Sequence, residues 1–144
     1  MSSRIAVADT NLVISFFLGS KAPASIAFSR LMDEYQLIAS HDTFAEFREV
    51  FMREKFARIR RERRLAAVSR YRSLVEMIPS VVDIQACADP KDDKFLSLAV
   101  SGNAALILTS DDHLLRLNPF RGIAILSPTD FLEQAVRSPE GPSR

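Results

Sequence analysis

Two short apolar segments of this chain each lead into an aspartate, and this arrangement strongly limits the folds available to it. Residues 4–8 (Arg-Ile-Ala-Val-Ala) run directly into Asp9, and residues 104–109 (Ala-Ala-Leu-Ile-Leu-Thr) run through Ser110 into Asp111. A short apolar segment between polar residues is typical of a buried strand. Because ligands of open α/β sheets bind beyond the carboxyl ends of the strands, we expect both aspartates at one crevice.

Helical and extended patterns alternate along the rest of the sequence. Strands are expected at 4–8, 35–39, 105–109 and 123–126, and residues 81–84 form either a short strand or an extended link. Helices are expected to begin near Asn11, at 21–23, at Asp42 or Thr43, at 89–90 and at 127–128. The third helix is expected to continue through the basic segment as far as Pro79. This alternation predicts an α/β fold with a parallel sheet of four to five strands and helices on both faces.

The length of the chain indicates its domain organisation. A chain of 144 residues is long enough for one domain with a substantial core, which we place at residues 3–135. Residues 138–144 contain no apolar side chain, and a disordered tail is expected over 136–144. The single cysteine, Cys87, excludes an internal disulfide. The sequence shows no membrane span and no secretory leader, so we expect a cytoplasmic protein.

Acidic residues occur at four separate places in this predicted fold. These places are Asp9, Glu46, the group Asp89, Asp92 and Asp93, and the pair Asp111 and Asp112. Each acid alone has an ordinary explanation, because aspartate caps helices and acids are favoured in the first turn. Gathered in one crevice, however, they would repel one another unless a cation lay between them. Mg²⁺ and Mn²⁺ prefer oxygen ligands, so the combination predicts a divalent metal site.

The order of these motifs resembles that of the PIN-domain family, whose members are metal-dependent ribonucleases common among the toxins of toxin–antitoxin systems. The resemblance is carried by Asp-Thr-Asn at 9–11, Glu46, the segment Asp-Lys-Phe-Leu at 93–96 and the strand that ends at Asp111. It spans about residues 4–132. It implies a single PIN-like nuclease domain.

The resemblance also implies roles for individual residues. Those expected to bind Mg²⁺ or Mn²⁺ and to be catalytic are Asp9, Glu46, Asp93 and Asp111, with Asp92 and Asp112 as additional metal candidates. Thr10, Asn11 and Ser110 flank these acids and are expected to support them through hydrogen bonds. The chain departs from the family at one position, because many members carry a further acid where this sequence has His113.

Positive charge is concentrated in residues 48–72. This segment holds ten Lys/Arg and three Glu, a net charge of +7, which leaves −6 on the rest of the chain. Because arginine binds phosphate groups well, we expect RNA contacts there. The residues expected to bind RNA are Arg53, Lys55, Arg58, Arg60, Arg61, Arg63 and Arg64. A solvated helical face is the alternative interpretation of the same charges.

These observations lead to one main hypothesis about function and one alternative. The main hypothesis is a metal-dependent ribonuclease that hydrolyses RNA phosphodiester bonds and is the toxin of a toxin–antitoxin pair. The family resemblance further implies a small antitoxin partner and homodimers. The alternative is a PIN-like module that binds nucleic acid or protein without catalysis.

Overall fold

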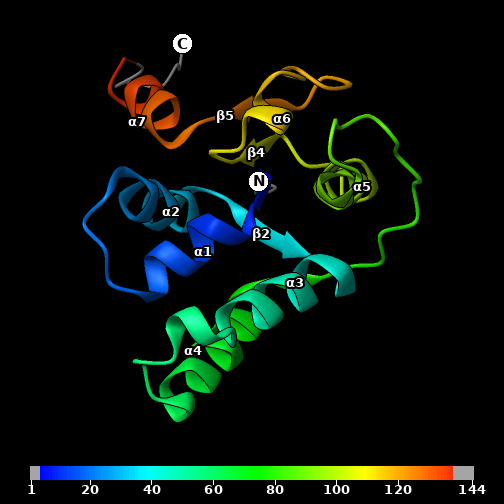
Figure 1. The fold of residues 1–144 in the computed structure, drawn as a ribbon. Helices are drawn as coiled ribbons and strands as arrows, with labels where there is room; N and C mark the ends of the chain where they lie inside the picture. Colours follow the sequence, from blue (N-terminus) through cyan, green and yellow to red (C-terminus); the bar gives the residue numbers. More distant parts are fainter. Residues whose placement is uncertain (1–3, 138–144) are drawn as a thin grey trace.

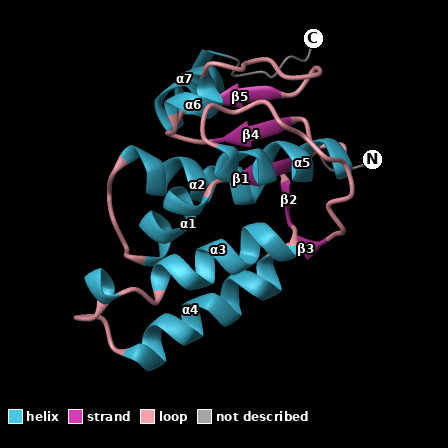
Figure 2. Cartoon of the chain, turned by 45° about the vertical axis from the view of Figure 1, so that its right-hand side comes forward, coloured by secondary structure: helices cyan, strands magenta, loops and turns pink. Residues whose placement is uncertain are grey.

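A parallel sheet lies at the centre of the computed structural model, which describes residues 4–137, with side chains described as far as residue 134. Within that range the sheet has five short strands in the order β3-β2-β1-β4-β5 (Figures 1 and 2). They are β1 (Ile5–Ala8), β2 (Gln36–Ala39), β3 (Glu76–Met77), β4 (Leu106–Leu108) and β5 (Ala124–Leu126). Four of the strands lie where the sequence predicts them, and the parallel α/β architecture is confirmed.

Helices cover both faces of this sheet, α1 and α2 on one side and α5 on the other (Figure 1). The α-helices of the described chain are α1 (Thr10–Phe17), α2 (Pro23–Glu34), α3 (His41–Phe51), α4 (Arg61–Leu74), α5 (Asp93–Ser101), α6 (Asp112–Leu115) and α7 (Pro128–Arg137). Two short 3₁₀-helices, η1 (Glu54–Phe56) and η2 (Pro90–Asp92), precede α4 and α5. Successive strand residues point to opposite faces, so Ala6 and Ala8 pack toward α1–α4 and α7, whereas Val7 packs toward α5 and α6.

The sheet changes its direction of winding at β1, which pairs with β2 on one side and with β4 on the other. Ala8 lies opposite Leu108 in this pairing, and the backbone amide of Asp9 donates to the carbonyl of Leu108 at 3.1 Å. The residues that follow β1 and β4 therefore emerge side by side. Such a switch point is the usual ligand-binding position in an open α/β sheet.

The edge strand differs from the sequence-based expectation. Residues 81–84 are not a strand; Val81 is 79% exposed, and the amides of Val81 and Val82 donate to Ser101 Oγ at 3.0 and 3.2 Å. The edge strand is instead β3, directly after α4. Its pairing with β2 continues one residue further, where the amide of Ile78 donates to the carbonyl of Ala39 at 2.9 Å.

The basic segment also differs, because it forms two helices and not the extension of one. The α-helix ends after Phe51, and apart from the short η1 the chain is not helical again until α4. Arg64 bridges this break; its Nε donates to the carbonyl of Ile59 at 2.9 Å and its Nη1 to that of Phe51 at 3.4 Å. Helix α4 ends at Leu74, before Pro79, because the chain enters β3 there.

Three smaller differences concern helix ends. Helix α3 is capped by Ser40, one residue before the start of the helix, in a reciprocal capping box with Thr43. Helix α6 has only four residues and was not predicted. Helix α7 reaches Arg137, so residues 136–137 of the expected tail are helical, while 138–144 lie outside the described residues. No described helix combines the length and the apolar character needed to cross a membrane.

Candidate metal centre

A polar cavity of about 180 Å³ lies beyond the carboxyl ends of β1 and β4. Four carboxylates from different parts of the chain line it. Asp9 directly follows β1, Glu46 lies on α3, Asp92 ends η2, and Asp111 precedes α6. The fold thus gathers acids that are up to about a hundred residues apart in the sequence.

Asp9 is held by three hydrogen bonds at the base of this cavity. Its Oδ1 caps α1 by accepting from the amides of Asn11 and Leu12 at 3.0 and 3.3 Å. Its Oδ2 accepts from the hydroxyl of Thr109. Burial raises the pKa of Asp9 above its ordinary value; the hydrogen bonds oppose this increase, and the nearby Asp111 adds to it. Asp9 is therefore rigidly placed, but its negative charge is poorly solvated.

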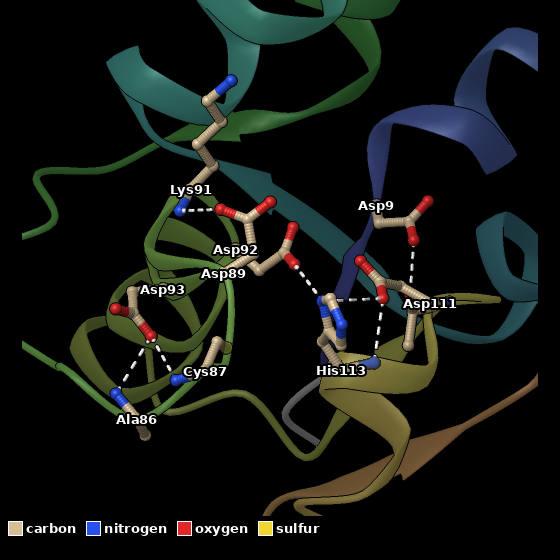
Figure 3. Close-up of polar contacts among 10 residues, drawn as sticks. Asp9, Ala86, Cys87, Asp89, Lys91, Asp92, Asp93, Asp111 and His113 are labelled. Atoms are coloured by element: carbon tan, nitrogen blue, oxygen red, sulfur yellow. Dashed lines mark hydrogen bonds and ion pairs between the residues drawn. The ribbon is translucent and has the colours of Figure 1, made fainter.

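Two of these carboxylates, Asp92 and Asp111, lie close to the imidazole of His113 (Figure 3). The Nδ1 of His113 lies 3.6 Å from Asp92 Oδ2 and 3.8 Å from Asp111 Oδ1. Asp111 also caps α6, because its Oδ1 accepts from the amide of His113 at 2.9 Å. Burial and the adjacent carboxyl of Asp111 raise the pKa of Asp92 to about 6, although His113 opposes the increase.

Asp93, which the sequence analysis chose as the third acid, does not line this cavity. Its Oδ1 accepts from the backbone amides of Ala86 and Cys87 at 3.0 and 2.8 Å, and Figure 3 shows it turned away from Asp111. Burial acts to raise its pKa, but these hydrogen bonds hold the pKa of Asp93 below its usual value. Neighbouring residues of a helix point in different directions, and here Asp92 faces the cavity whereas Asp93 faces the amides of residues 86–87. Of this pair, the structure places Asp92 and not Asp93 at the cavity, so we take Asp92 as the candidate metal ligand.

Glu46 has a partner on each carboxylate oxygen. Thr10 Oγ1 donates to Oε2 at 2.6 Å, and Lys94 Nζ lies 2.5 Å from Oε1. The side chains of Lys94 and Glu46 are 24% and 27% exposed. These contacts join α3 to the start of α1 and to α5. The carboxylate of Glu46 is thereby held in place in the lining of the cavity.

The predicted supporting residues divide into two groups. Thr10 and Asn11 line the cavity, as expected from their place after Asp9. Ser110 is exposed, and the supporting hydroxyl on that side belongs instead to Thr109, which also accepts from the amide of Asp111 at 2.9 Å. The sequence did not lead us to predict a supporting role for Thr109. A polar residue at the buried end of an apolar strand is the feature that could have indicated it. Asp112 is exposed and lies outside the cavity lining.

The predicted RNA-binding residues also divide. Arg53 and Lys55 are exposed and line the cavity itself. Four others are exposed but do not line it: Arg58, Arg60, Arg61 and Arg63. Arg64 is only 8% exposed, and its guanidinium binds backbone carbonyls. The RNA-binding role predicted for Arg64 therefore lacks the exposed guanidinium that it requires, because this guanidinium bridges α3 and α4.

The donor set fits a divalent cation of the Mg²⁺ or Mn²⁺ type. One ligand atom each from Asp92, Asp111 and His113 lie within 4.8 Å of one another. Asp9 lies close enough to Asp111 for the charge of Asp111 to raise its pKa. Oxygen-rich sites of this kind suit hard cations, and an imidazole nitrogen is accepted more readily by Mn²⁺ than by Mg²⁺.

Comparison with known proteins agrees with this fold. Among solved structures, the fold is similar to the crystal structure of VapBC2 from Rickettsia felis bound to a DNA fragment from their promoter. The match has a TM-score of 0.59 and 14% sequence identity, and it covers 85% of this chain and 98% of that chain. At this identity the likeness concerns the fold alone. The sequence matches no curated protein.

The family model of the PIN domain matches residues 6–113. This range covers most of the chain and contains the four carboxylates that line the cavity, from Asp9 to Asp111. By sequence pattern and by fold, the chain belongs to the PIN-domain family.

Proposed function

We propose that this protein is a divalent-metal-dependent endoribonuclease that hydrolyses RNA phosphodiester bonds. The observation that carries the proposal is the convergence of Asp9, Glu46, Asp92 and Asp111 on one polar cavity with basic side chains at its edge. These four carboxylates would hold Mg²⁺ or Mn²⁺, with His113 beside them. A bound divalent cation supplies Lewis-acid stabilisation of the charge that develops on a phosphodiester during hydrolysis.

The protein's own groups would position the RNA. Arg53 and Lys55 lie in the segment after α3 and line the same cavity as the acids. Their exposed cationic groups can bind the phosphates that flank the bond to be cut. The exposed arginines of the following segment extend this basic surface away from the cavity. Single-stranded RNA is the favoured substrate, because an unstacked strand can follow a groove more easily than a duplex.

The biological setting is part of the same proposal. Membership in the PIN-domain family and the fold similarity to VapBC2 support a role as the toxin of a toxin–antitoxin pair. A cognate antitoxin is then the protein partner. Action on cellular RNA implies a cytoplasmic location, and homodimerisation is the assembly that we propose for the free toxin.

A cleavage assay with single-stranded RNA tests the activity. We expect cleavage in Mn²⁺ or Mg²⁺, its loss in EDTA, and a decrease of at least about a hundredfold in Asp9→Asn and in Asp92→Asn, in line with the loss of a metal ligand. Asp112→Asn is the matched control, since Asp112 is exposed outside the cavity lining. Parent-like rates in a folded Asp9→Asn protein would refute the assignment.

One observation favours a second candidate, a binding module without catalysis. Lys94 already neutralises part of the charge of Glu46, so the acid cluster has an internal cation without any metal. In that case the parent protein would bind RNA with the salt dependence of phosphate contacts but would cleave no RNA in Mg²⁺ or Mn²⁺. The same assay therefore separates the two functions.

A further inference from the structure

We infer that Lys94 is a positioning residue that competes with the metal ion for Glu46 and lowers the metal affinity of the site. The inference rests on the proposed function, because it concerns the same acidic cavity. In this inference, a side chain of the protein itself sets the affinity of the site for the metal.

Both carboxylate oxygens of Glu46 already have a partner. Thr10 donates to Oε2 at 2.6 Å, and the ammonium of Lys94 contacts Oε1 at 2.5 Å. A hydroxyl can share its oxygen with a cation, because it brings no charge. The ammonium cannot do so at equal cost, since two cations on one carboxylate oxygen repel each other. Metal binding through Glu46 therefore requires Lys94 to move away or to weaken its contact.

A neighbouring cavity offers the displaced ammonium of Lys94 a second position. Lys94 does not line the acidic cavity; it lines a neighbouring cavity of about 230 Å³. That second cavity also contains the exposed carboxylates of Asp42 and Asp83 and the hydroxyls of Ser80 and Ser97. The lysine thus approaches Glu46 from outside the metal cavity. A rotation of its flexible side chain would carry the ammonium toward two other acids without crossing the cavity of the metal.

Lys94 balances part of the negative charge of the acidic cavity. The cavity holds four carboxylates, and Lys94 is the cation in direct contact with one of them. Removing its charge leaves Glu46 without a counter-ion, which favours an incoming divalent cation. The pair is partly exposed, so the expected change is modest: about a fivefold lower Kd for Mn²⁺, which is the upper part of the range for partly solvated ion pairs.

Isothermal titration with MnCl₂ alone, in the absence of RNA, measures this effect directly. The test variant is Lys94→Met, which keeps the length of the apolar stem but removes the charge; Lys94→Gln is a second variant in case Met disturbs packing. Lys94→Arg retains the charge and is expected to keep the parent Kd within about twofold or to weaken binding. Circular dichroism and thermal unfolding establish that each variant is folded.

Two further variants separate a local effect from a general one. Lys91→Met removes an exposed charge one turn earlier, outside the cavity lining, and its Kd is expected to stay within about twofold because exposed charges are screened. In a Glu46→Gln background, Lys94→Met is expected to change the Kd by less than twofold. This double-variant cycle shows whether Lys94 acts through Glu46.

The outcomes distinguish this inference from the proposed function. The inference is supported if Lys94→Met binds Mn²⁺ more tightly than the parent and this gain is absent from Lys91→Met and from the Glu46→Gln background. It is also supported if Lys94→Met binds Mn²⁺ and the parent shows no binding. The inference alone is overturned if the parent binds Mn²⁺ and the folded Lys94→Met and Lys94→Gln proteins bind it with equal or lower affinity. Absence of binding in the parent and in both variants overturns it together with the proposed metal site.

Discussion

The neighbouring residues Asp92 and Asp93 give the sharpest test of the structure, because replacing each by asparagine should change stability in opposite directions. Asp92 faces the acidic cavity, and its pKa is raised to about 6 from 3.8. Asp93 accepts two backbone hydrogen bonds, and its pKa is lowered. Without metal, Asp92→Asn should therefore stabilise the protein near neutral pH, and Asp93→Asn should destabilise it.

The size of the first effect follows from proton linkage. A pKa raised from 3.8 to about 6 corresponds to about 3 kcal/mol at neutral pH if it is fully transmitted to folding. The side chain of Asp92 is 18% exposed beside an open cavity, so solvent screening reduces this to about 1–2 kcal/mol. Asp92→Asn also removes a negative charge from the N-terminus of α5, which reduces the gain in stability by about 0.5 kcal/mol. We expect a net gain of about 1 kcal/mol in the free energy of unfolding.

The stability difference between Asp92→Asn and the parent should depend on pH. The unfolded carboxyl of Asp92 loses its proton near pH 3.8 and the folded one near pH 6, so between these values the unfolded state binds fewer protons. The parent therefore loses stability from this group as the pH rises through that window. The advantage of Asp92→Asn should be near zero at about pH 3.5 and complete at about pH 7.5.

Asp93→Asn should behave in the opposite way. Its ionised form is stabilised in the folded protein by the amides of Ala86 and Cys87, so its contribution is present above its ordinary pKa and lost in acid. We expect a loss of about 1 kcal/mol at neutral pH, the usual value for hydrogen bonds of this kind. The deficit should shrink as the pH falls.

Urea unfolding followed by far-UV circular dichroism measures both variants, with EDTA present so that trace metal does not bind. The same variants are then titrated with Mn²⁺, which should bind Asp93→Asn as it binds the parent but should bind Asp92→Asn at least about tenfold more weakly. If Asp92→Asn is less stable than the parent at neutral pH, or if Asp93→Asn alone loses Mn²⁺ binding, the placement of the two carboxylates is refuted.

Two more predictions concern the basic segment. Arg64→Met should destabilise the protein by about 2 kcal/mol in urea unfolding, because it leaves two backbone carbonyls without their donor, while RNA affinity per folded molecule should stay unchanged. A stable Arg64→Met protein with weakened RNA binding would contradict the structural role. Replacing Arg53 and Lys55 together by alanine should weaken binding of single-stranded RNA about tenfold and flatten its salt dependence. The matched pair Arg60→Ala and Arg61→Ala, outside the cavity, should have a clearly smaller effect, and equal effects would count against the proposed RNA path.

The central part of the fold could be predicted because its signals are local. Apolar strands that end at Asp9 and near Asp111 place these acids at one sheet edge as soon as the strands are parallel. The two-residue strand β3 has no such signal, since two residues show no periodicity. Its position depends on where α4 delivers the chain, which is a property of the packed structure.

The positions that the sequence did not predict depend on contacts between distant segments. Asp92 and Asp93 are alike in sequence, and only the path of residues 86–87 over the start of α5 decides which one turns away. Arg64 looks like its exposed neighbours, yet the break after α3 gives it two carbonyls to bind. Thr109 belongs to a strand pattern, but its hydroxyl connects Asp9 with Asp111. No periodicity in the sequence encodes these three contacts.

The acidic cluster can form without a metal because the fold stabilises its negative charges in two ways. Asp9 and Asp111 each cap a helix, so backbone amides stabilise their anionic forms. Glu46 and Asp92 each face a basic side chain, Lys94 and His113. The compensation is incomplete, since the pKa values of Asp9 and Asp92 remain raised. A site that is largely ordered but still short of positive charge would gain stability from a divalent cation, which is the combination that the proposed metal-dependent hydrolysis requires.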